Sequence, residues 1–315
     1  MSSSPSLSNQ GTNKIGFGCY GVTESQANEW IREAIITGYR HFDCAFLYQN
    51  ESAIGKGLRK CINQGLIRRE EIFITSKLPM NGMDPTRVNY FLTKTLENLD
   101  CDYLDLYLIH APFCVKYITD NQFYPVNPES GRLDIDHTTN LNETWKSMEQ
   151  VVDSGLVRSI GLSNFNENQM IDLMASCEIK PSIVQNETHV YFQQKSLRNF
   201  CHQNDIIYQS FAPLGSAKSA AINGHDLVIE DATINQLAVK YQVSNSQICL
   251  RWHQQSNITP IVGFDSLQHI RENIKLNHFT LSTDDLAIIS QLDRNERIFY
   301  FDKVPGTRSH RYYPF

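Results

Sequence analysis

Four polar residues stand at or just beyond the ends of short apolar segments of this chain. Asp43 ends the segment GYRHFD, Lys77 ends EIFITSK and His110 ends YLDLYLIH, while Tyr48 follows Asp43 in CAFLYQNE. If these segments are neighbouring β-strands, a carboxylate, an ammonium, an imidazole and a phenol meet at one edge of a sheet. The set offers a proton donor without a metal or a nucleophilic Ser or Cys, which favours reduction of a carbonyl group.

Tyr48 is the predicted proton donor. A free phenol has a pKa near 10, and an ammonium ~4 Å away favours the phenolate by up to ~4 kcal/mol at an effective dielectric of about 20. We therefore expect Lys77 to lower the pKa of Tyr48, and Asp43 to keep Lys77 charged. A neutral His110 would hydrogen-bond the substrate oxygen and hold the carbonyl in place. Each residue alone is more often a solvated charge or a packed ring, so the prediction depends on all four together.

Size and composition argue against several classes of protein. The chain has 315 residues, of which 41% are hydrophobic and 20% charged, as expected for a globular protein with a large core. A net charge of −6 makes nucleic acid an unexpected partner. No apolar segment approaches the ~18 residues of a membrane span, and MSSSPSLSNQGTNK lacks the apolar core of a signal peptide. We expect a cytoplasmic protein.

The eight cysteines are scattered singly, with no CxxC pair and no Cys/His cluster. This spacing favours reduced, mostly buried thiols over a zinc site or a disulfide framework. The cysteines stand at positions 19, 44, 61, 101, 114, 177, 201 and 249.

Strand-like and helix-like segments alternate along the chain, and eight strands are each followed by a helix. The strand-like segments are 15–20, 38–45, 71–78, 103–110, 157–164, 182–188, 206–215 and 259–264. Near-continuous apolar strands separated by helices indicate a parallel sheet covered by helices. Eight such units predict an α/β fold, a (β/α)8 TIM barrel forming a single domain over 1–315. A doubly wound sheet is the alternative, but no GxGxxG stands between a strand and a helix.

Two long irregular segments interrupt this alternation. One spans 111–140, after the fourth strand, and the other is the tail at 293–315. In a barrel, the loop that follows a strand lies on the catalytic face. We therefore predict that both segments form walls of the substrate pocket, with simple surface decoration as the alternative.

The chain resembles the aldo-keto reductase family over nearly its whole length. Matching segments include GYRHFDCAFLYQNE, EIFITSKL, YLDLYLIHAP and IKPSIVQNETHVYFQQ. The resemblance implies a catalytic tetrad of Asp43, Tyr48, Lys77 and His110. It also implies that NADPH binds in an extended form across the barrel mouth, without a Rossmann domain. Its pro-R hydride would pass to the carbon of an aldehyde or ketone.

The same resemblance assigns residues to each part of the cofactor. They are Ser163, Asn164 and Gln185 for the nicotinamide carboxamide, Phe211 for stacking on the ring, Gly18 and Cys19 near that end, Leu214 and Ser216 for the pyrophosphate, and Glu272 and Asn273 for the adenine. Phe211 replaces a Tyr that is usual in the family, and a Phe keeps the flat apolar face.

The positions expected to hold the 2′-phosphate of NADPH depart from the family pattern. Gly263, Phe264 and His269 stand where the family usually has Lys, Ser and Arg. Loss of two charge-assisted bonds, each worth ~1.5–3 kcal/mol, would erode the selectivity for NADPH. NADPH remains the predicted cofactor, with NADH as the alternative. Three other cations are candidates to hold the phosphate instead: Lys218, Arg271 and Lys275.

The predicted substrate pocket also departs from the family. Pro79 and Ala111 stand where the family often has Trp, which should widen the pocket. Four aromatic residues are candidates to refill it: Tyr20, Phe113, Tyr117 and Phe123. We therefore expect a substrate carbonyl that is bulkier or more polar than a simple aldehyde, such as a steroid ketone or a sugar-derived carbonyl.

Two other functions remain alternatives at this point. Reductase-like barrels also serve as catalytically silent, cofactor-binding or structural subunits, although the intact tetrad argues against this. A metal-dependent hydrolase would use His41, Asp43 and His110, but a further His ligand at another strand end has no clear candidate. We expect a small-molecule carbonyl as the substrate and neither nucleic acid nor a membrane as a partner, and the protein is predicted to be a monomer without a metal.

Overall fold

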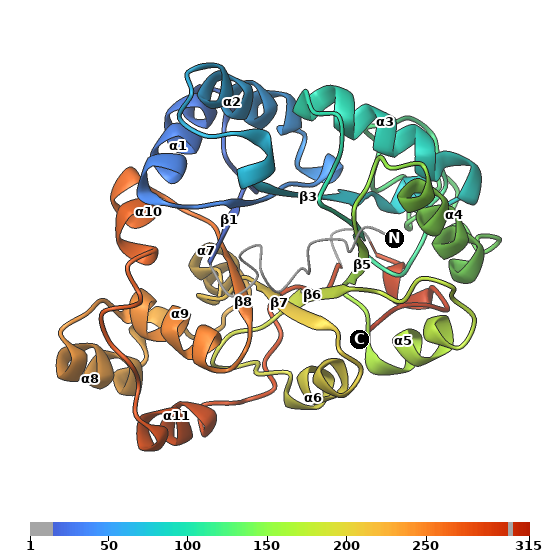
Figure 1. Cartoon of the computed structure of the whole chain (residues 1–315). Coiled ribbons are helices and arrows are strands. Elements are labelled where there is room, and N and C mark those ends of the chain that lie inside the picture. The colour runs from blue at the N-terminus through green and yellow to red at the C-terminus, as the bar shows by residue number, and fades with distance from the viewer. Residues whose placement is uncertain (1–14, 302–304) are drawn as a thin grey trace.

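Eight short parallel strands close into a barrel at the centre of the molecule (Figure 1). The computed structural model describes residues 15–301 and 305–315. The strands are β1 (Gly16–Gly18), β2 (His41–Asp43), β3 (Phe73–Leu78), β4 (Leu106–Ile109), β5 (Ile160–Ser163), β6 (Ile183–Glu187), β7 (Ile207–Phe211) and β8 (Thr259–Val262). Each strand pairs with the next along the chain, and β8 pairs with β1. The predicted (β/α)8 barrel is confirmed, and closure of the sheet excludes the doubly wound alternative.

Helices surround the barrel on all sides (Figure 1). They are α1 (Glu24–Thr37), α2 (Glu51–Asn63), α3 (Val88–Leu99), α4 (Leu141–Asp153), α5 (Glu167–Met174), α6 (Lys195–Gln203), α7 (Ala217–Ile222), α8 (Ala232–Tyr241), α9 (Asn245–Gln255), α10 (Leu267–Asn273) and α11 (Thr283–Ser290). Short 3-10 turns are η2 (Phe46–Tyr48), η3 (Arg69–Glu71), η4 (Met80–Gly82), η5 (Pro85–Arg87), η6 (Val228–Glu230) and η7 (Thr307–Ser309). The sequence predicts the strand–helix units, but not α7, which follows β7.

The first helix shows how the sequence sets the element boundaries. Gln26 reaches back to accept a bond from the backbone N–H of Thr23 at 3.1 Å, which satisfies a free donor at the start of α1. Gly38 ends the helix in the left-handed region, with φ of 108°, and its N–H donates to the Ala34 carbonyl. The buried face of α1 is the one that the apolar spacing predicts: Ala27, Trp30, Ile31, Ala34 and Ile35.

The side chains that point into the barrel change from apolar to polar along the strands. Successive residues of a strand point to opposite faces, so Phe73, Thr75 and Lys77 share one face of β3. Phe73 packs in a small apolar cluster with residues of β4 and β6, which closes the lower part of the barrel. Lys77, two steps of the alternation further along β3, lies among polar groups. Polar groups therefore gather at the carboxyl end of β3.

The two irregular segments contact each other. The N–H of Leu133, in the loop 111–140, donates to the carbonyl of Pro305 in the tail at 2.8 Å. Arg311 of the tail donates through Nη2 to the carbonyl of Thr139 at 2.7 Å. The loop and the tail thus form one joined structure, while positions 302–304 of the tail lie outside the described residues. Their predicted role as pocket walls stays a prediction.

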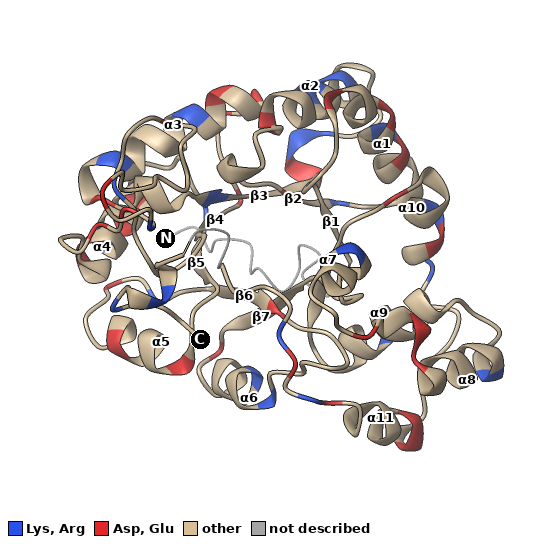
Figure 2. Cartoon of the chain, turned by 180° about the vertical axis from the view of Figure 1, so that it is seen from behind, with Lys and Arg blue, Asp and Glu red and all other residues tan. Residues whose placement is uncertain are grey.

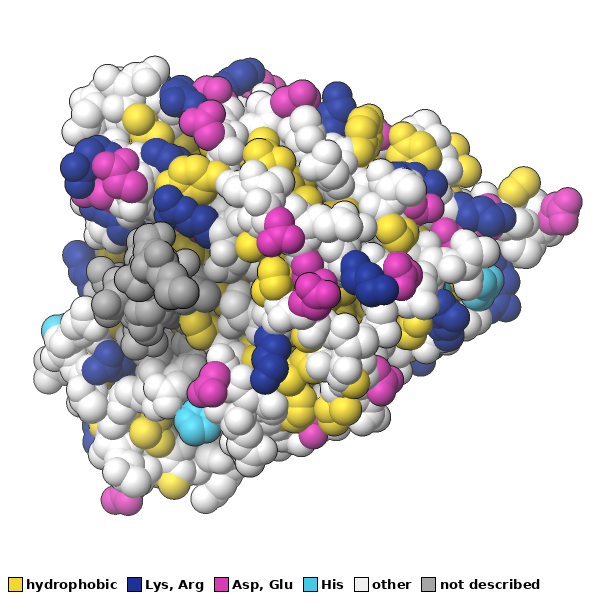
Figure 3. All heavy atoms as spheres, turned by 45° about the vertical axis from the view of Figure 1, so that its right-hand side comes forward, with side chains coloured by type: hydrophobic (Ala, Val, Ile, Leu, Met, Phe, Trp, Pro, Cys, Tyr) yellow, Lys and Arg dark blue, Asp and Glu magenta, His cyan; other side chains and the backbone are white. Residues whose placement is uncertain are grey.

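Charged side chains lie mainly on the surrounding helices and loops (Figure 2). On the face drawn in Figure 3, basic and acidic side chains are interspersed rather than gathered by sign. Among residues 15–301 and 305–315, no helix is long and apolar enough to span a membrane.

Candidate active site

The four predicted catalytic residues come from three neighbouring strands and the turn after the first of them. Asp43 is the last residue of β2, Lys77 lies near the end of β3, and His110 directly follows β4. Tyr48 ends η2, the 3-10 turn that follows β2. Parallel neighbours end at the same edge of the sheet, so this arrangement brings all four side chains to one mouth of the barrel.

Lys77 is the centre of the hydrogen bonds in this site. Its Nζ donates to a carboxylate oxygen of Asp43, to the carbonyl of Cys44 at 3.0 Å and to the hydroxyl of Tyr48 at 3.2 Å. The ammonium is almost completely buried, with 1% of the side chain exposed. Burial alone disfavours the charged form, but the charge of Asp43 and the contact with Tyr48 outweigh it and raise the pKa of Lys77. Lys77 is therefore a fixed positive charge.

The pKa of Tyr48 differs from the sequence-based expectation. Burial raises it to about 12, because desolvation of the phenolate outweighs the opposing charge of Lys77. The expectation of a net lowered pKa is wrong, although Lys77 does act in the predicted direction. The phenol is thus neutral at neutral pH, and Lys77 stabilises the anion that forms only when the proton leaves.

His110 is held in its neutral form. Burial and the positive charge of Lys77 place the pKa of His110 well below its ordinary value. The imidazole packs edge-on to the Tyr48 ring, with 5.8 Å between the ring centroids. Its Nδ1 is buried and has no hydrogen-bond partner among the described residues. A neutral imidazole beside the phenol fits the predicted role of holding a carbonyl oxygen.

Three residues predicted to bind the nicotinamide carboxamide adjoin the tetrad. Gln185, on β6, donates through Nε2 to Asp43 at 2.7 Å. Asn164 follows β5 with φ of 64°, and its Nδ2 donates to the His110 carbonyl at 2.8 Å and to Ser163 at 3.1 Å. The Oδ1 of Asn164 is buried without a partner among the described residues. A free buried acceptor suits the amide N–H of a carboxamide, so these residues fit the cofactor.

Further residues predicted for the nicotinamide end and for the pyrophosphate lie at the ends of β1 and β7 and in the loop after β7. Gly18 ends β1, where an added Cβ would lie 3.0 Å from the carbonyl of Val262, so the position tolerates little more than glycine. The Phe211 ring contacts Phe299 of the tail, with 5.7 Å between centroids. Ser216 caps the start of α7 with φ of 43°, and Leu214 is half-buried in the loop before it. Their contacts with a cofactor stay predictions.

The three residues at the expected 2′-phosphate position differ in their packing and exposure. Phe264 stacks on Phe17 with 4.8 Å between ring centroids, so it packs on a ring of the core. Gly263 is exposed, and nothing lies within 4 Å of a Cβ added there. His269 is exposed near the start of α10. Among the candidate substitutes, Arg271 pairs with Glu33 of α1 at 2.7 Å, while Lys218 and Lys275 are exposed.

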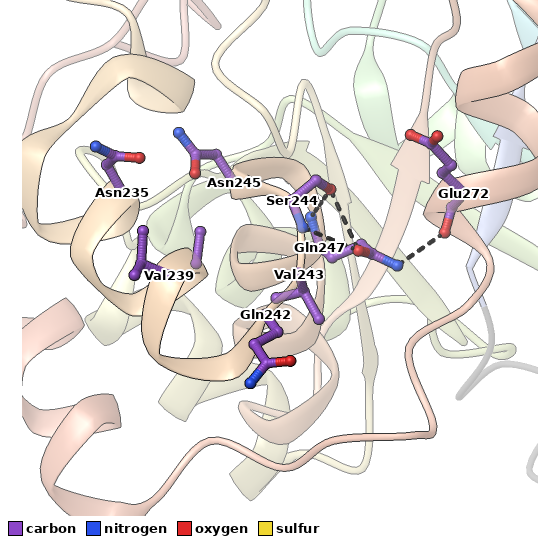
Figure 4. Close-up of a pocket in the computed structure, with 9 residues that line it drawn as sticks. Asn235, Val239, Gln242, Val243, Ser244, Asn245, Gln247 and Glu272 are labelled. Atoms are coloured by element: carbon purple, nitrogen blue, oxygen red, sulfur yellow. Dashed lines mark hydrogen bonds between the residues drawn. The ribbon is translucent and has the colours of Figure 1, made fainter.

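The residues predicted for the adenine lie on α10. Glu272 stands at the edge of a surface hollow of about 540 Å³, which α8, α9 and the loop between them complete (Figure 4). Gln247 of α9 donates through Nε2 to the carbonyl of Glu272 at 3.1 Å, which fixes this end of α10. Asn273 is buried at the helix end. The hollow is lined by four amide side chains together with Ala238, Val239 and Val243, and it lies outside the barrel.

The predicted substrate residues divide into exposed and buried groups. Tyr20 is 67% exposed and packs against the Tyr48 ring, with 5.1 Å between centroids. Pro79 and Ala111 are buried. Phe113 packs on Phe301 of the tail at 5.2 Å, which links the loop 111–140 to that segment. The other aromatic candidates pack on η2 and α3 rings, Phe123 on Phe46 and Tyr117 on Phe91.

Two buried residues near the tetrad were missed by sequence reasoning. Gln209, on β7, accepts a bond from Gln185 at 3.0 Å. Glu51 begins α2 and accepts a bond from the hydroxyl of Ser76, next to Lys77, at 2.6 Å. Burial raises the pKa of Glu51 to about 7. Glu51 lies only three residues after Tyr48, which is the one feature of the sequence that points to it. Its burial could not be predicted, because it depends on how α2 packs.

The metal-site alternative has no geometric support. The ring of His41 bonds to the hydroxyl of Thr75 at 2.9 Å and packs edge-on to Phe73. Burial lowers the pKa of His41 to about 4. In the part of the chain that the structure describes, no group of three or more His, Cys, Asp or Glu side chains is arranged to hold a metal ion.

Comparison with known proteins identifies the family. A profile described as "Aldo/keto reductase family" matches residues 10–294. An NADP-dependent D-sorbitol-6-phosphate dehydrogenase of Malus domestica is 39% identical over 93% of this chain and 94% of its own. An NAD(P)H-dependent D-xylose reductase I,II of Candida tropicalis is also 39% identical, over 92% and 93% of the two chains. The solved aldose reductase of Schistosoma japonicum superposes with a TM-score of 0.86 at 33% identity, covering 96% of this chain and 94% of that one.

The chain therefore belongs to the aldo/keto reductase family. It is an NAD(P)H-dependent aldo-keto reductase, an oxidoreductase that reduces carbonyl groups. The family resemblance seen in the sequence is confirmed. The alternative of a catalytically silent barrel is set aside, because the chain is an enzyme of this family.

Proposed function

We propose that this enzyme uses NADPH to reduce a steroid ketone or a sugar-derived carbonyl, with Tyr48 as the proton donor. The observation that carries the proposal is the bond from Lys77 Nζ to the Tyr48 hydroxyl oxygen at 3.2 Å. Since that oxygen accepts from Lys77, the phenolic O–H is left to point at a substrate. When bound, the nicotinamide cofactor supplies the hydride that reduces the carbonyl carbon.

The chain's own groups then complete the reaction. Neutral His110 donates a hydrogen bond to the substrate oxygen and aligns it with the phenol. As negative charge develops on that oxygen, Tyr48 gives up its proton. The buried ammonium of Lys77 stabilises the resulting phenolate, and Asp43 holds Lys77 in position. Asn164 and Gln185, which bond to His110 and Asp43, orient the carboxamide beside these groups.

Two features support the proposed substrate class. Pro79 and Ala111 supply little side-chain volume where the family often has Trp, and Tyr20 offers an exposed aromatic face next to Tyr48. The two relatives described above carry names that refer to D-xylose and D-sorbitol-6-phosphate, which favours the sugar-derived carbonyl. We also propose a cytoplasmic monomer, and light scattering on the purified protein tests its mass in solution.

Steady-state kinetics test the proposal. NADPH and NADH oxidation is measured with a steroid ketone, a sugar aldehyde, a quinone and a small aliphatic aldehyde. We expect kcat/KM for the steroid or sugar carbonyl to exceed that of the aliphatic aldehyde by about tenfold or more, with NADPH preferred. A mock purification from cells that do not express the enzyme measures contaminating reductase activity. Equal kcat/KM for all four carbonyls would refute the proposed substrate class.

A further inference from the structure

Two thiols lie side by side behind the tetrad. Cys19 directly follows β1 and Cys44 directly follows β2, and the preceding residues, Gly18 and Asp43, are register partners in the sheet. The two Sγ atoms are 3.6 Å apart, with the Cys44 thiol directed at Cys19. Both side chains are fully buried. Neither thiol has a part in the reaction described above.

The backbone of this pair is joined to the catalytic hydrogen bonds. The carbonyl of Cys44 accepts a bond from Lys77 Nζ at 3.0 Å, so it is one of the three groups that hold the ammonium. The N–H of Cys19 donates to the carbonyl of Asp43 at 2.9 Å. A shift of either cysteine backbone therefore disturbs Lys77 or Asp43.

We propose that Cys19 and Cys44 form a reversible disulfide when the enzyme meets hydrogen peroxide, and that this bond lowers turnover. Peroxide oxidises one thiol to a sulfenic acid and is itself reduced to one water. The second thiol then attacks that sulfur, forms the S–S bond and releases the oxygen as a second water. Two thiols and one peroxide give one disulfide and two waters. A dithiol reductant reverses the step.

The geometry permits the bond but makes it costly. Adjacent strands lie ~4.8 Å apart, and a disulfide requires Cα atoms about 4.4–6.8 Å apart, so the strand spacing is suitable. From 3.6 Å, the sulfur atoms must approach by ~1.5 Å to reach a bond length of about 2.05 Å. The strands resist this movement, which strains the disulfide and makes it easy to reduce. If the Cys44 backbone follows its sulfur, the Cys44 carbonyl shifts relative to Lys77 Nζ, which it accepts from at 3.0 Å.

The thiols react more slowly than exposed ones. The hydrogen bond to Cys19 and burial both raise the pKa of Cys44, which lowers its thiolate fraction at neutral pH. The test therefore uses an excess of peroxide over protein and follows the reaction in time. Formation of the bond does not depend on the proposed function, whereas its effect on turnover does.

The experiment treats the reduced, full-length enzyme with hydrogen peroxide and then blocks free thiols with an alkylating agent. Peptide mapping without reduction should find one cross-linked species containing Cys19 and Cys44. Turnover should fall by about tenfold or more, as expected for loss of one charged hydrogen bond, and dithiothreitol should restore it. Each variant is compared with its own activity before oxidation.

Single variants separate this pair from the other thiols. Cys19→Ser and Cys44→Ser should form no such cross-link and lose little activity to peroxide, while Cys249→Ser, a buried thiol on α9, should respond like the wild type. Equal, reductant-reversible inactivation of Cys19→Ser would place the sensitive thiol elsewhere and overturn the proposal. Absence of the cross-link in the wild type overturns it as well. A cross-link without a change in turnover, in an enzyme that reduces its substrate, overturns the regulatory part alone.

Discussion

Lys77 sets the electrostatics of the site because three acceptors share one buried ammonium. The carboxylate of Asp43 balances its charge, and the hydroxyl of Tyr48 is the acceptor whose own charge would change in the proposed reaction. Burial keeps Tyr48 and His110 neutral, with the pKa of Tyr48 at about 12 and that of His110 well below its ordinary value. Because the phenol is neutral, the ammonium of Lys77 interacts with it only weakly in the ground state. The interaction becomes strong when negative charge forms on the phenol oxygen, so it lowers the energy of the transition state.

The proposed role of Tyr48 as proton donor predicts how the Tyr48→Phe variant behaves. The variant keeps the ring that packs on Tyr20 and His110 but loses the acidic O–H. We expect kcat to fall by roughly 10²–10⁴-fold, the usual contribution of a positioned general acid. Cofactor affinity, measured by quenching of protein fluorescence, should change less than about threefold. Near-normal turnover in the variant is the result that would contradict the assignment.

Gly263 provides a direct test of the cofactor preference. The position is open, with no atom within 4 Å of an added Cβ, so a longer side chain fits without displacing neighbours. Gly263→Lys should tighten NADPH relative to NADH by about tenfold, because it restores one charge-assisted bond to the 2′-phosphate. Equilibrium titration of both cofactors gives the ratio. Gly263→Met, similar in length but uncharged, is the control, and an unchanged ratio in Gly263→Lys would mean that the phosphate is held elsewhere.

At the level of elements, β6 fixes the start of the tail through one buried carboxylate. Glu187 ends β6, is fully buried and accepts bonds from the backbone N–H groups of Ile298 at 2.6 Å and Phe299 at 3.0 Å. Phe299 in turn packs on Phe211, the residue predicted to stack on the nicotinamide. One strand therefore carries both Gln185, which is predicted to bind the nicotinamide carboxamide, and Glu187, which anchors the segment packed on Phe211.

Glu187→Gln tests this anchor. The amide replaces one acceptor oxygen by a donor that faces a backbone N–H, so one hydrogen bond to a charged group is lost. Loss of ~1.5–3 kcal/mol should speed hydrogen exchange at Ile298 or Phe299 by roughly 10–100-fold. Exchange resolved by mass spectrometry on peptides from the tail provides the measurement. Glu167→Gln, whose carboxylate bonds to Ser196, is the matched control and should leave these amides unchanged.

The sequence predicts the elements better than their contacts. Apolar runs and helical periodicity are local properties, so the eight strand–helix units and the buried face of α1 can be read from the residues. The meeting of Asp43 and Lys77 follows from strand order. The net pKa of Tyr48, the stacking of Phe264 on Phe17 and the burial of Glu51 depend on packing between distant segments. No local pattern encodes them.

For the whole molecule, Glu51 links stability to pH. Burial raises its pKa from 4.5 to about 7, so between these values the folded state keeps a proton that the unfolded state has lost. The free energy of unfolding therefore falls as pH rises through this window, by up to about 3 kcal/mol from this group. The loss is complete above the folded pKa.

Glu51→Gln should remove this contribution. The amide is neutral at every pH and similar in shape to the protonated acid that bonds to Ser76. Urea unfolding from pH 5 to pH 8 should give similar stabilities for variant and wild type at pH 5. At pH 8 the variant should be more stable, by an amount approaching ~3 kcal/mol. A stability difference that stays constant over this range would show that Glu51 does not titrate with a raised pKa.

The joined loop and tail have a consequence for exchanging segments between this enzyme and its relatives. Leu133 bonds to Pro305 and Arg311 bonds to Thr139, so each segment satisfies backbone groups of the other. A graft of the 111–140 loop from a homologue onto this barrel would leave those groups unmatched, and so would a graft of the tail alone. The two segments form a single exchangeable module, although more than 150 residues separate them along the chain. Chimeras made between relatives should keep their function when the loop and the tail come from the same parent.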